Sequence, residues 1–517
     1  MNKIYDKINY KAISYVDTRP NILLVVLDDV GFADLGFTSS EISTPVMNSM
    51  AQDEILMTNF HVTPTCSPTR AIMLTGVDNH LNGFGTMNEA MADNQRGKPG
   101  YETYLNYDVV TVSSLLQDSG YHTYMSGKWH LAYGGVTPNV EEDWDELWIH
   151  YDPYSRGFEE TFSGGIPGNH FSEVGIGPGH AAFYTRNGER VTLPDDFYSA
   201  TSYTDYLLEF IDKNHDDGKP MFMYLPFWTS HFPLHAPEEY IEKYDGVYDK
   251  GWDEIRKERF EKQKELGFIS KDLELPDRRE DVPAWEELSP EEQAYEAKKM
   301  QIFAAMTDIT DDNIGRVIDH LKEIGEYENT LIFIFSDNGP ESAEVTKHAP
   351  IVGFAAEEYQ EFLDQFDNTL ENIGSETSNI SLGAGWAQVG SSPLYREKTF
   401  VTEGGTRVPM VVKVPGESIN FKTNSFSAVQ DITPTILDYA QVEHPGNMYD
   451  GREIHSMSGK SLKPLFEGKL NSCMHLMSHL EWNYLETVPY TKEIGRHSDL
   501  YLQWEMENGN YSIFQKT

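Results

Sequence analysis

The stretch Ile22-Leu23-Leu24-Val25-Val26-Leu27-Asp28-Asp29-Val30-Gly31 decides the fold. Its first six residues form a continuous apolar run of strand length, which is typical of a strand buried on both faces and hence of a parallel sheet. Two carboxylates follow directly, at the end of the strand where α/β sheets place their ligands. The stretch therefore predicts a parallel sheet with an acidic site at the carboxyl end of this strand.

Other segments repeat this plan. Further strands are predicted over 121–125, 220–225, 330–335 and 408–412. Helices are predicted from Pro45, over 66–75, 110–116 and 304–324, and from Asp431. Residues 237–300 are rich in charge and are expected to form exposed helices and loops, and residues 341–395 are expected to form loops over a site.

Composition limits the function classes that the chain can serve. Its 517 residues are too many for one small core, so we expect one large domain and a smaller partner. An apolar share of 39% suffices for a globular interior. The net charge of −43 argues against nucleic acid and anionic membranes as partners, so any anion site must be built locally from clustered cations.

The cysteine content and the apolar runs of the chain indicate its cellular location. Cys66 and Cys473 provide neither a disulfide framework nor a thiolate metal site. Residues 1–8 lack the apolar run of a signal peptide, and the run at 22–27 is far too short to span a membrane. We therefore expect a cytoplasmic location and no membrane partner.

The segment Thr65-Cys66-Ser67-Pro68-Thr69-Arg70-Ala71-Ile72-Met73-Leu74-Thr75-Gly76 places a cysteine at the predicted start of a helix. Pro68 suits the first helical turn because it lacks a backbone N–H and has a preset φ, and Gly76 can end the helix. Free N–H groups and the helix dipole would favour negative charge at Cys66. The alternative is a buried structural cysteine before a core helix.

Two sets of polar side chains follow the predicted strands and this helix start. Oxygen ligands that suit a hard divalent cation, Ca²⁺ or Mg²⁺, are supplied by Asp28, Asp29, Asp337 and Asn338. Groups that are or can become cationic are Arg70, Lys128, His130, His231 and Lys398. Converged, the second set would bind a small tetrahedral oxyanion, with one histidine as acid and the other as base. Taken singly, each residue is an ordinary turn or solvated residue, and spacing alone does not bring them together.

The motif Cys66-Ser67-Pro68-Thr69-Arg70 followed by Leu74-Thr75-Gly76 resembles the signature of the formylglycine-dependent (type I) sulfatases of the alkaline-phosphatase superfamily. Five further segments fall in that family's order: 27–31, 127–130, 231–233, 336–339 and 398–405. The similarity covers roughly residues 19 to 440. Through 65–70 and 97–101 the chain looks most like bacterial cytosolic arylsulfatases.

This resemblance implies an α/β fold with a large mixed, mostly parallel central sheet flanked by helices, as in alkaline phosphatase. It implies a sulfuric ester hydrolase that cleaves a small-molecule sulfate monoester to an alcohol or phenol and sulfate. The nucleophile would be the hydrate of Cα-formylglycine, which a maturation enzyme makes from Cys66. One hydroxyl of the hydrate would attack sulfur, and the second would allow release of sulfate by elimination.

The resemblance also implies a role for each polar residue. A metal, Ca²⁺ in preference to Mg²⁺, would be bound by Asp28, Asp29, the modified Cys66, Asp337 and Asn338. Asp337 would also act as base toward the attacking hydroxyl, while Arg70 and Lys128 would orient the diol and neutralise its charge. His130 would remove the remaining hydroxyl proton. Contacts to the sulfate group would come from Lys128, His231 and Lys398, of which the last two protonate the leaving oxygen.

We expect a catalytic domain over residues 1–440 and a smaller α+β subdomain over 441–517. Many family members end with a basic Gly-Asp-Trp-Lys strand and an acid-rich Tyr-Asp-Leu segment, and neither is clear between 470 and 517. The terminal sheet is therefore expected to be shortened, rearranged or completed by a partner. The oligomeric state and the natural ester stay open.

Two alternatives remain at this point. One is a phosphonate monoester or phosphodiester hydrolase that uses the same formylglycine. The family's sulfatases carry Lys128, His231 and Lys398 as found here, which favours sulfate. The other is a non-catalytic binding protein in which Cys66 stays unmodified, and the presence of every catalytic residue speaks against it.

Overall fold

The structure is a computed structural model that describes residues 17–132, 151–166, 168–175, 182–346, 356–416, 419–469, 502–507 and 510–515. Contacts divide the chain into two units, and the described residues up to 469 all lie in the first. Within the described ranges, no helix is long and apolar enough to cross a membrane. Cys473 lies outside these ranges.

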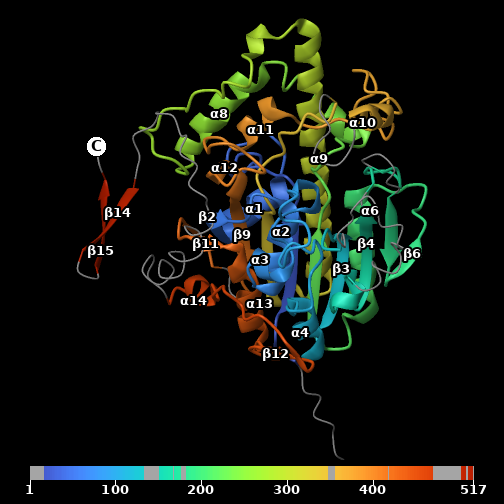
Figure 1. The fold of residues 1–517 in the computed structure, drawn as a ribbon, viewed down its shortest axis with the longest axis vertical. Coiled ribbons are helices and arrows are strands. Elements are labelled where there is room, and N and C mark those ends of the chain that lie inside the picture. The colour runs from blue at the N-terminus through green and yellow to red at the C-terminus, as the bar shows by residue number, and fades with distance from the viewer. Residues whose placement is uncertain are drawn as a thin grey trace, which may run out of the picture. The chain divides into compact units, whose positions relative to one another are not determined.

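A mixed sheet forms the centre of the first unit (Figure 1). The described residues give it eleven strands in the order β10-β2-β9-β8-β1-β7-β3-β4-β5-β6, with β11 paired to β2. Their bounds are β1 (Asn21–Leu27), β2 (Ile55–His61), β3 (His122–Lys128), β4 (Glu160–Ile166), β5 (Phe183–Arg186), β6 (Glu189–Val191), β7 (Met221–Pro226), β8 (Thr330–Ser336), β9 (Arg407–Lys413), β10 (Phe421–Thr423) and β11 (Ser427–Ala428).

The middle of the sheet is parallel. Strands β8, β1, β7, β3 and β4 run in one direction, whereas β9 is antiparallel to both of its neighbours. All seven residues of β1 are buried, as the apolar run predicted. The register pairs Leu27 with Ser336 and Val26 with Pro226, so the carboxyl ends of β1, β8 and β7 lie level.

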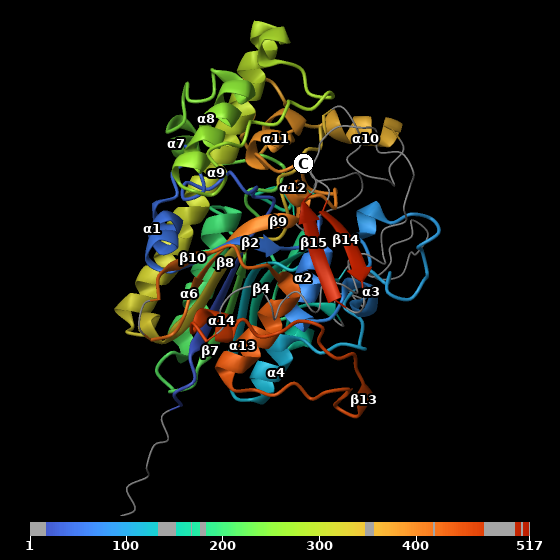
Figure 2. The same cartoon turned by 90° about the vertical axis from the view of Figure 1, so that its left-hand side faces the viewer.

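Helices cover both faces of the sheet (Figure 2). On one face pack α1 (Pro45–Asp53), α6 (Ser199–Asn214) and α9 (Pro290–Glu323), and on the other α2 (Cys66–Thr75), α4 (Val112–Asp118) and α13 (Ile432–Ala440). The remaining helices of the described residues are α3 (Asn79–Asn82), α7 (Glu238–Glu242), α8 (Gly251–Glu265), α10 (Ala356–Leu363), α11 (Ala384–Gly390), α12 (Glu403–Thr406) and α14 (Lys463–Phe466). The predicted fold class, a large mostly parallel sheet flanked by helices, is confirmed.

Two regions differ from the prediction of exposed helices and loops over 237–300 and of loops over 341–395. Within 237–300, α8 is charged on one side but buries Trp252, Ile255 and Phe260 on the other, so it belongs to the core. Within 341–395, α10 and α11 are helical, and α11 packs on α8 through Trp386. In the second region, the surface charge of α10 and the glycines of α11 weakened the helical pattern in the sequence.

The described residues between α13 and residue 469 are still part of the first unit and are hydrogen-bonded to its helices. The Ser458 N–H donates to the Gly76 carbonyl over 2.8 Å, and the Leu462 N–H donates to Thr435 Oγ1 over 2.8 Å. A short hairpin, β12 (Met448–Tyr449) and β13 (Arg452–Glu453), precedes α14. The second unit contains the antiparallel pair β14 (Leu502–Glu507) and β15 (Asn510–Gln515). The domain boundary at residue 440 stays a prediction.

Candidate active site

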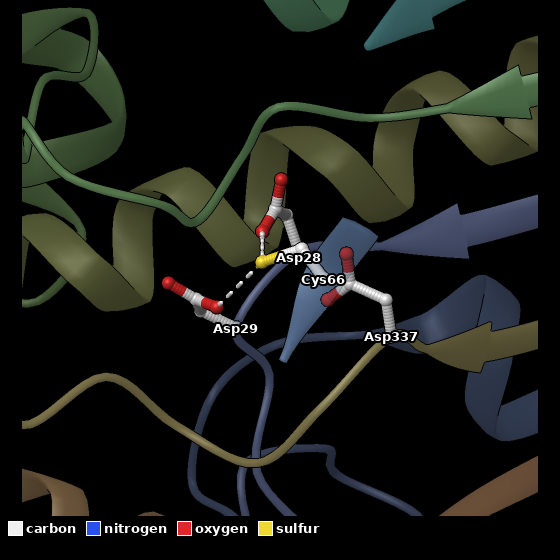
Figure 3. A group of neighbouring side chains, drawn as sticks. All are labelled: Asp28, Asp29, Cys66 and Asp337. Carbon is white, nitrogen blue, oxygen red and sulfur yellow. Dashed lines mark hydrogen bonds between the residues drawn. The ribbon is translucent and has the colours of Figure 1, made fainter. Parts of the chain in front are cut away.

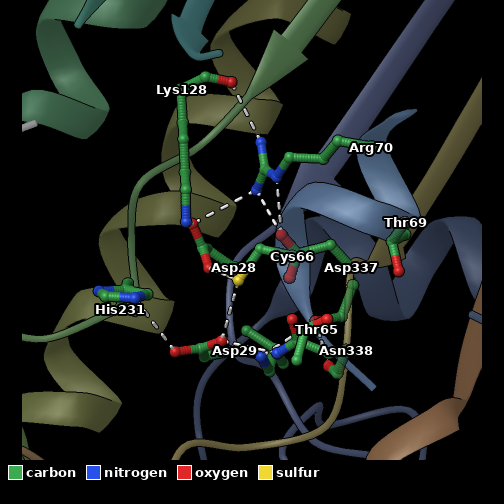
Figure 4. Close-up of polar contacts among 12 residues, drawn as sticks. Asp28, Asp29, Thr65, Cys66, Thr69, Arg70, Lys128, His231, Asp337 and Asn338 are labelled. Atoms are coloured by element: carbon green, nitrogen blue, oxygen red, sulfur yellow. Dashed lines mark hydrogen bonds and ion pairs between the residues drawn. The ribbon is translucent and has the colours of Figure 1, made fainter. Parts of the chain in front are cut away.

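The ends of the central strands bring acidic, basic and amide side chains together (Figure 4). The turns after β1 and β8 carry four of the five predicted metal ligands, Asp28, Asp29, Asp337 and Asn338, and the fifth, Cys66, starts α2. Lys128 ends β3, the loop after β7 holds His231, and Arg70 lies in α2. Lys398, 369 positions along the chain from Asp29, is in direct contact with it. The structure therefore collects residues from distant segments into one site.

Three carboxylates surround the Cys66 side chain (Figure 3). One ligand atom from each of Asp28, Asp29, Cys66 and Asp337 lies within 4.8 Å of the others, and all four residues are buried. The Cys66 Sγ is 3.7 Å from Asp28 Oδ1 and 3.9 Å from Asp29 Oδ1. Carboxylates this close repel one another strongly unless positive charge is added.

Arg70 and Lys128 supply part of that charge. The Arg70 Nε donates to Asp337 Oδ2 over 2.8 Å, and its Nη2 lies 3.3 Å from Asp28 Oδ2. The Lys128 Nζ donates to the same Asp28 oxygen over 2.5 Å. Arg70 Nη1 also donates to the Lys128 carbonyl over 3.1 Å. These contacts fix the guanidinium between the ends of three strands.

Lys398 and His231 meet at the third carboxylate. The Lys398 Nζ donates to Asp29 Oδ2 over 2.8 Å, and the His231 Nε2 lies 3.7 Å from the same oxygen. The His231 Nδ1 lies 2.6 Å from the Phe232 carbonyl. Because a carbonyl oxygen only accepts, Nδ1 carries a proton and Nε2 is the nitrogen that faces the site.

The buried charges shift the pKa values of the site in different directions. Burial raises the pKa of Asp28, and burial together with the charge of Asp28 raises the pKa of Asp337. Burial acts in the same way on Asp29, but Lys398 and the other nearby basic groups together outweigh it and lower the pKa of Asp29. Burial also raises the pKa of the Cys66 thiol, which keeps it neutral.

The donor atoms fit the predicted metal. Asp337 Oδ1 and Asn338 Oδ1 are buried and have no hydrogen-bond partner among the described residues. The Asn338 Nδ2 donates to Asp29 Oδ1 over 2.6 Å and to the Gly339 carbonyl over 2.9 Å. The amide oxygen of Asn338 therefore remains available as a metal ligand. Buried oxygens without partners are costly unless a bound group satisfies them. Carboxylate and amide oxygens are the ligands of a hard divalent cation such as Ca²⁺.

Helix α2 begins at Cys66 as predicted. Thr65 is its N-cap residue with extended backbone, Pro68 lies in the first turn, and Gly76 ends the helix with φ of 68°. Every residue of α2 is buried. The expected preference for negative charge at Cys66 is outweighed by burial and by the charge of Asp337, since both raise the pKa of the thiol.

Several non-glycine residues in the site, or next to its residues in the chain, have the left-handed backbone. Asp29 and His130 both have φ of 59°, and Arg396 and Thr399 beside Lys398 have φ of 65° and 75°. Asp and His tolerate this region, whereas a β-branched threonine is a clear outlier there. Such conformations cluster where a structure must hold functional side chains. His130, also buried, lies two residues beyond β3.

Two residues that the sequence interpretation did not assign support the site. The Ser336 Oγ accepts from the Val30 N–H over 3.0 Å and donates to the Asn338 carbonyl over 2.9 Å, so it joins the two acidic turns. Glu341 is the second carboxylate of Lys398, at 3.0 Å. Ser336 lies within the predicted segment 336–339 and Glu341 lies two residues beyond it, and this proximity is the only signal that could have pointed to them.

The fold belongs to the alkaline-phosphatase-like class of α/β proteins, with a buried site of acidic and basic side chains at the carboxyl ends of its central strands. Comparison with known protein families matches residues 20–442 to the sulfatase family. That match spans most of the chain, and the chain therefore belongs to the sulfatase family.

Relatives agree with this assignment. The chain is 40% identical to an uncharacterized sulfatase of Schizosaccharomyces pombe over 86% of this chain and 78% of that protein. It is 35% identical to the arylsulfatase of Klebsiella aerogenes over 88% of this chain and 93% of that protein. Among solved structures, i-CgsB in complex with k-i-k-neocarrahexaose superposes with a TM-score of 0.57 at 21% identity, covering 88% of this chain and 77% of its own. The chain is thus a sulfatase enzyme.

Proposed function

We propose that the chain hydrolyses sulfate monoesters with the hydrate of a Cα-formylglycine, made from Cys66, as nucleophile and with Ca²⁺ as metal. The place of the Cys66 side chain carries this proposal, because its Sγ lies among three buried carboxylates at the start of α2. A buried thiol with a raised pKa is a poor nucleophile, whereas hydroxyl groups in this place would lie beside a metal site.

The charges of the site support a divalent metal and an anionic substrate. Four buried carboxylates (Asp28, Asp29, Asp337 and Glu341) face three cations (Arg70, Lys128 and Lys398), so the cluster carries one net negative charge when all of these groups are ionised. Asp28, Asp29, Asp337 and Asn338 would hold the metal. When bound, Ca²⁺ would lower the pKa of an adjacent hydroxyl and give the cluster a net positive charge, which favours binding of a sulfate group.

Residues around Cys66 would handle the protons of the nucleophile. Arg70 and Lys128 are held by the surrounding carboxylates and can orient two hydroxyl groups at position 66. Asp337, whose pKa is raised by burial, can accept the proton of the attacking hydroxyl. His130 is assigned the proton of the second hydroxyl, whose loss regenerates the aldehyde and releases sulfate.

His231 and Lys398 would serve the leaving group. Both contact Asp29, and Nε2 is the His231 nitrogen that faces the site. Burial lowers the pKa of His231, so a proton carried on its Nε2 is readily given to the departing ester oxygen. The Lys398 ammonium would bind the sulfate group and stabilise its charge.

Mass spectrometry of the peptide that spans Cys66 tests the proposal. Protein from the native host, where a maturation enzyme acts, is expected to carry formylglycine at position 66. The same preparation is expected to hydrolyse an aryl sulfate faster than an aryl phosphodiester. An unmodified thiol in active protein would refute the nucleophile, and a large preference for the phosphodiester would refute the substrate class.

Removal of the metal should lower stability. Chelation is expected to lower the thermal unfolding midpoint, and Ca²⁺ should restore it, because a ligand at about 100 times its Kd stabilises the native state by about 2.7 kcal/mol. Asp29→Asn should shrink the Ca²⁺-dependent shift, whereas Asp245→Asn, at an exposed carboxylate, should leave it unchanged. Differential scanning calorimetry checks this, and a chelated protein that does not respond to excess Ca²⁺ would contradict it. Titration with Mg²⁺ compares the two metals.

The role of His231 predicts a dependence on the leaving group. His231→Ala is expected to slow aryl sulfates with poor leaving groups by about 10²–10⁴-fold, which is the usual contribution of general acid catalysis, and good leaving groups much less. Steady-state kinetics over a series of substituted phenyl sulfates measures the effect. Equal slowing across the series would show that His231 is not the acid.

A further inference from the structure

Trp228 lies in the loop after β7, beside two residues of the proposed sulfate pocket. The Lys128 Nζ lies 4.3 Å from the centroid of the Trp228 ring, and the His231 ring centroid lies 4.5 Å away. Trp228 is 3% exposed, and its carbonyl accepts from the His231 N–H over 3.0 Å. We propose that Trp228 is a positioning residue that holds Lys128 and His231 in place for sulfuryl transfer. This inference rests on the functions proposed above for these two residues.

For Lys128 the ring supplies a second support. The ammonium contacts Asp28 and lies over Trp228, and it lies over no other aromatic ring of the described residues. A lysine side chain is flexible and carries three donors. The face of the Trp228 ring attracts the desolvated ammonium and holds it in place. This contact does not use any of the N–H donors of Lys128 in a hydrogen bond. Lys128 thus keeps donors for a sulfate oxygen while Asp28 serves the metal.

For His231 the Trp228 ring is one of two aromatic contacts. The centroid of the imidazole lies 4.5 Å from that of Trp228 and 4.4 Å from that of Phe232. The bond from Nδ1 to the Phe232 carbonyl fixes its rotation. Together these contacts hold Nε2 toward Asp29 Oδ2. A proton donor held in this way needs no rearrangement before it protonates a leaving oxygen.

The indole N–H gives an independent indication. Trp228 Nε1 is buried and has no hydrogen-bond partner among the described residues. Buried tryptophans usually pair this group, and Trp129, Trp252 and Trp386 each donate it to a backbone carbonyl. The packing of Trp228 therefore favours contact of its ring with the two pocket residues over pairing of its own N–H.

Replacement of the ring tests the proposal. In Trp228→Leu, kcat/KM for aryl sulfates with poor leaving groups should fall about tenfold more than for good ones, and inhibition by inorganic sulfate should weaken about tenfold. Trp228→Phe retains a ring and should stay close to the wild type. Trp386→Leu, at a tryptophan equally buried but remote from these residues, should lower the unfolding midpoint without changing either readout.

Phe232→Leu provides a second variant in case Trp228→Leu does not fold. It should increase the leaving-group dependence through His231 but leave sulfate inhibition unchanged. Wild-type values of both readouts in folded Trp228→Leu would overturn the proposal, and so would a Trp228→Phe variant as impaired as Trp228→Leu. Failure of the proposed function can be told apart from failure of this inference. The wild type would then lack the expected sulfatase activity, or His231→Ala would lack the expected leaving-group dependence, whatever residue stands at position 228.

Discussion

Cys66→Ala is expected to abolish sulfate ester hydrolysis while the fold and the metal site persist. Alanine cannot be converted to formylglycine, so the site keeps its carboxylates and cations but has no nucleophile. Loss of an essential nucleophile costs up to about 10⁶-fold in kcat. Steady-state hydrolysis of an aryl sulfate measures the loss. The Ca²⁺-dependent shift of the unfolding midpoint should persist, reduced by the loss of the one ligand that residue 66 supplies. Residual turnover within tenfold of the wild type would contradict a nucleophile at position 66.

Cys66→Ser is the sharper companion variant. Its single hydroxyl can attack sulfur once but has no second hydroxyl from which to eliminate sulfate. The expected result is a burst of one phenol per active site and a protein mass increased by one sulfuryl group. Mass spectrometry must also show that the serine itself is not oxidised. Sustained turnover by unoxidised Cys66→Ser would show that release of sulfate does not depend on a geminal diol.

The sequence predicts those parts of the site whose residues are adjacent in the chain. Residues 22–27 and 330–335 are apolar runs that end in acids, so both strands and the acids at their ends could be located. Their convergence could not, because β8 and β7 flank β1 although hundreds of residues separate these strands in the chain. Only the family resemblance assigned Lys398 and Asp29 to the same site, and their direct contact became known from the structure.

The sequence pattern did not predict helix α11 or the role of Trp228, because both depend on contacts between residues that are far apart in the chain. Helix α11 includes Gly385 and ends at Gly390, so its intrinsic helix propensity is low. A Cβ on Gly385 would lie 2.6 Å from the Trp252 ring, so the close packing of α8 on α11 requires glycine there. Trp228 follows an apolar strand and resembles an ordinary core residue in the sequence. Its importance becomes visible only when Lys128 and His231 are found against its ring.

Arg70→Met is expected to destabilise the protein by about 3–5 kcal/mol, because it leaves Asp337 and Asp28 buried without their guanidinium partner. Ca²⁺ should recover part of this loss, since the metal supplies positive charge to the same carboxylates. Denaturant unfolding with chelator and with Ca²⁺ measures both effects. The double variant Arg70→Met/Asp337→Asn removes one orphaned charge and should be more stable than Arg70→Met with chelator.

Arg259→Met is the matched control for this experiment. Arg259 is also buried and binds the carboxylates of Asp34 and Glu41, but neither belongs to the proposed metal site. We expect a comparable destabilisation that Ca²⁺ does not specifically offset. If Ca²⁺ restored both variants equally, its effect would not arise from the carboxylates around Cys66. If Arg70→Met unfolded at the wild-type denaturant concentration, the buried cluster would not need its arginine, and the charge balance on which the proposed metal site rests would be wrong.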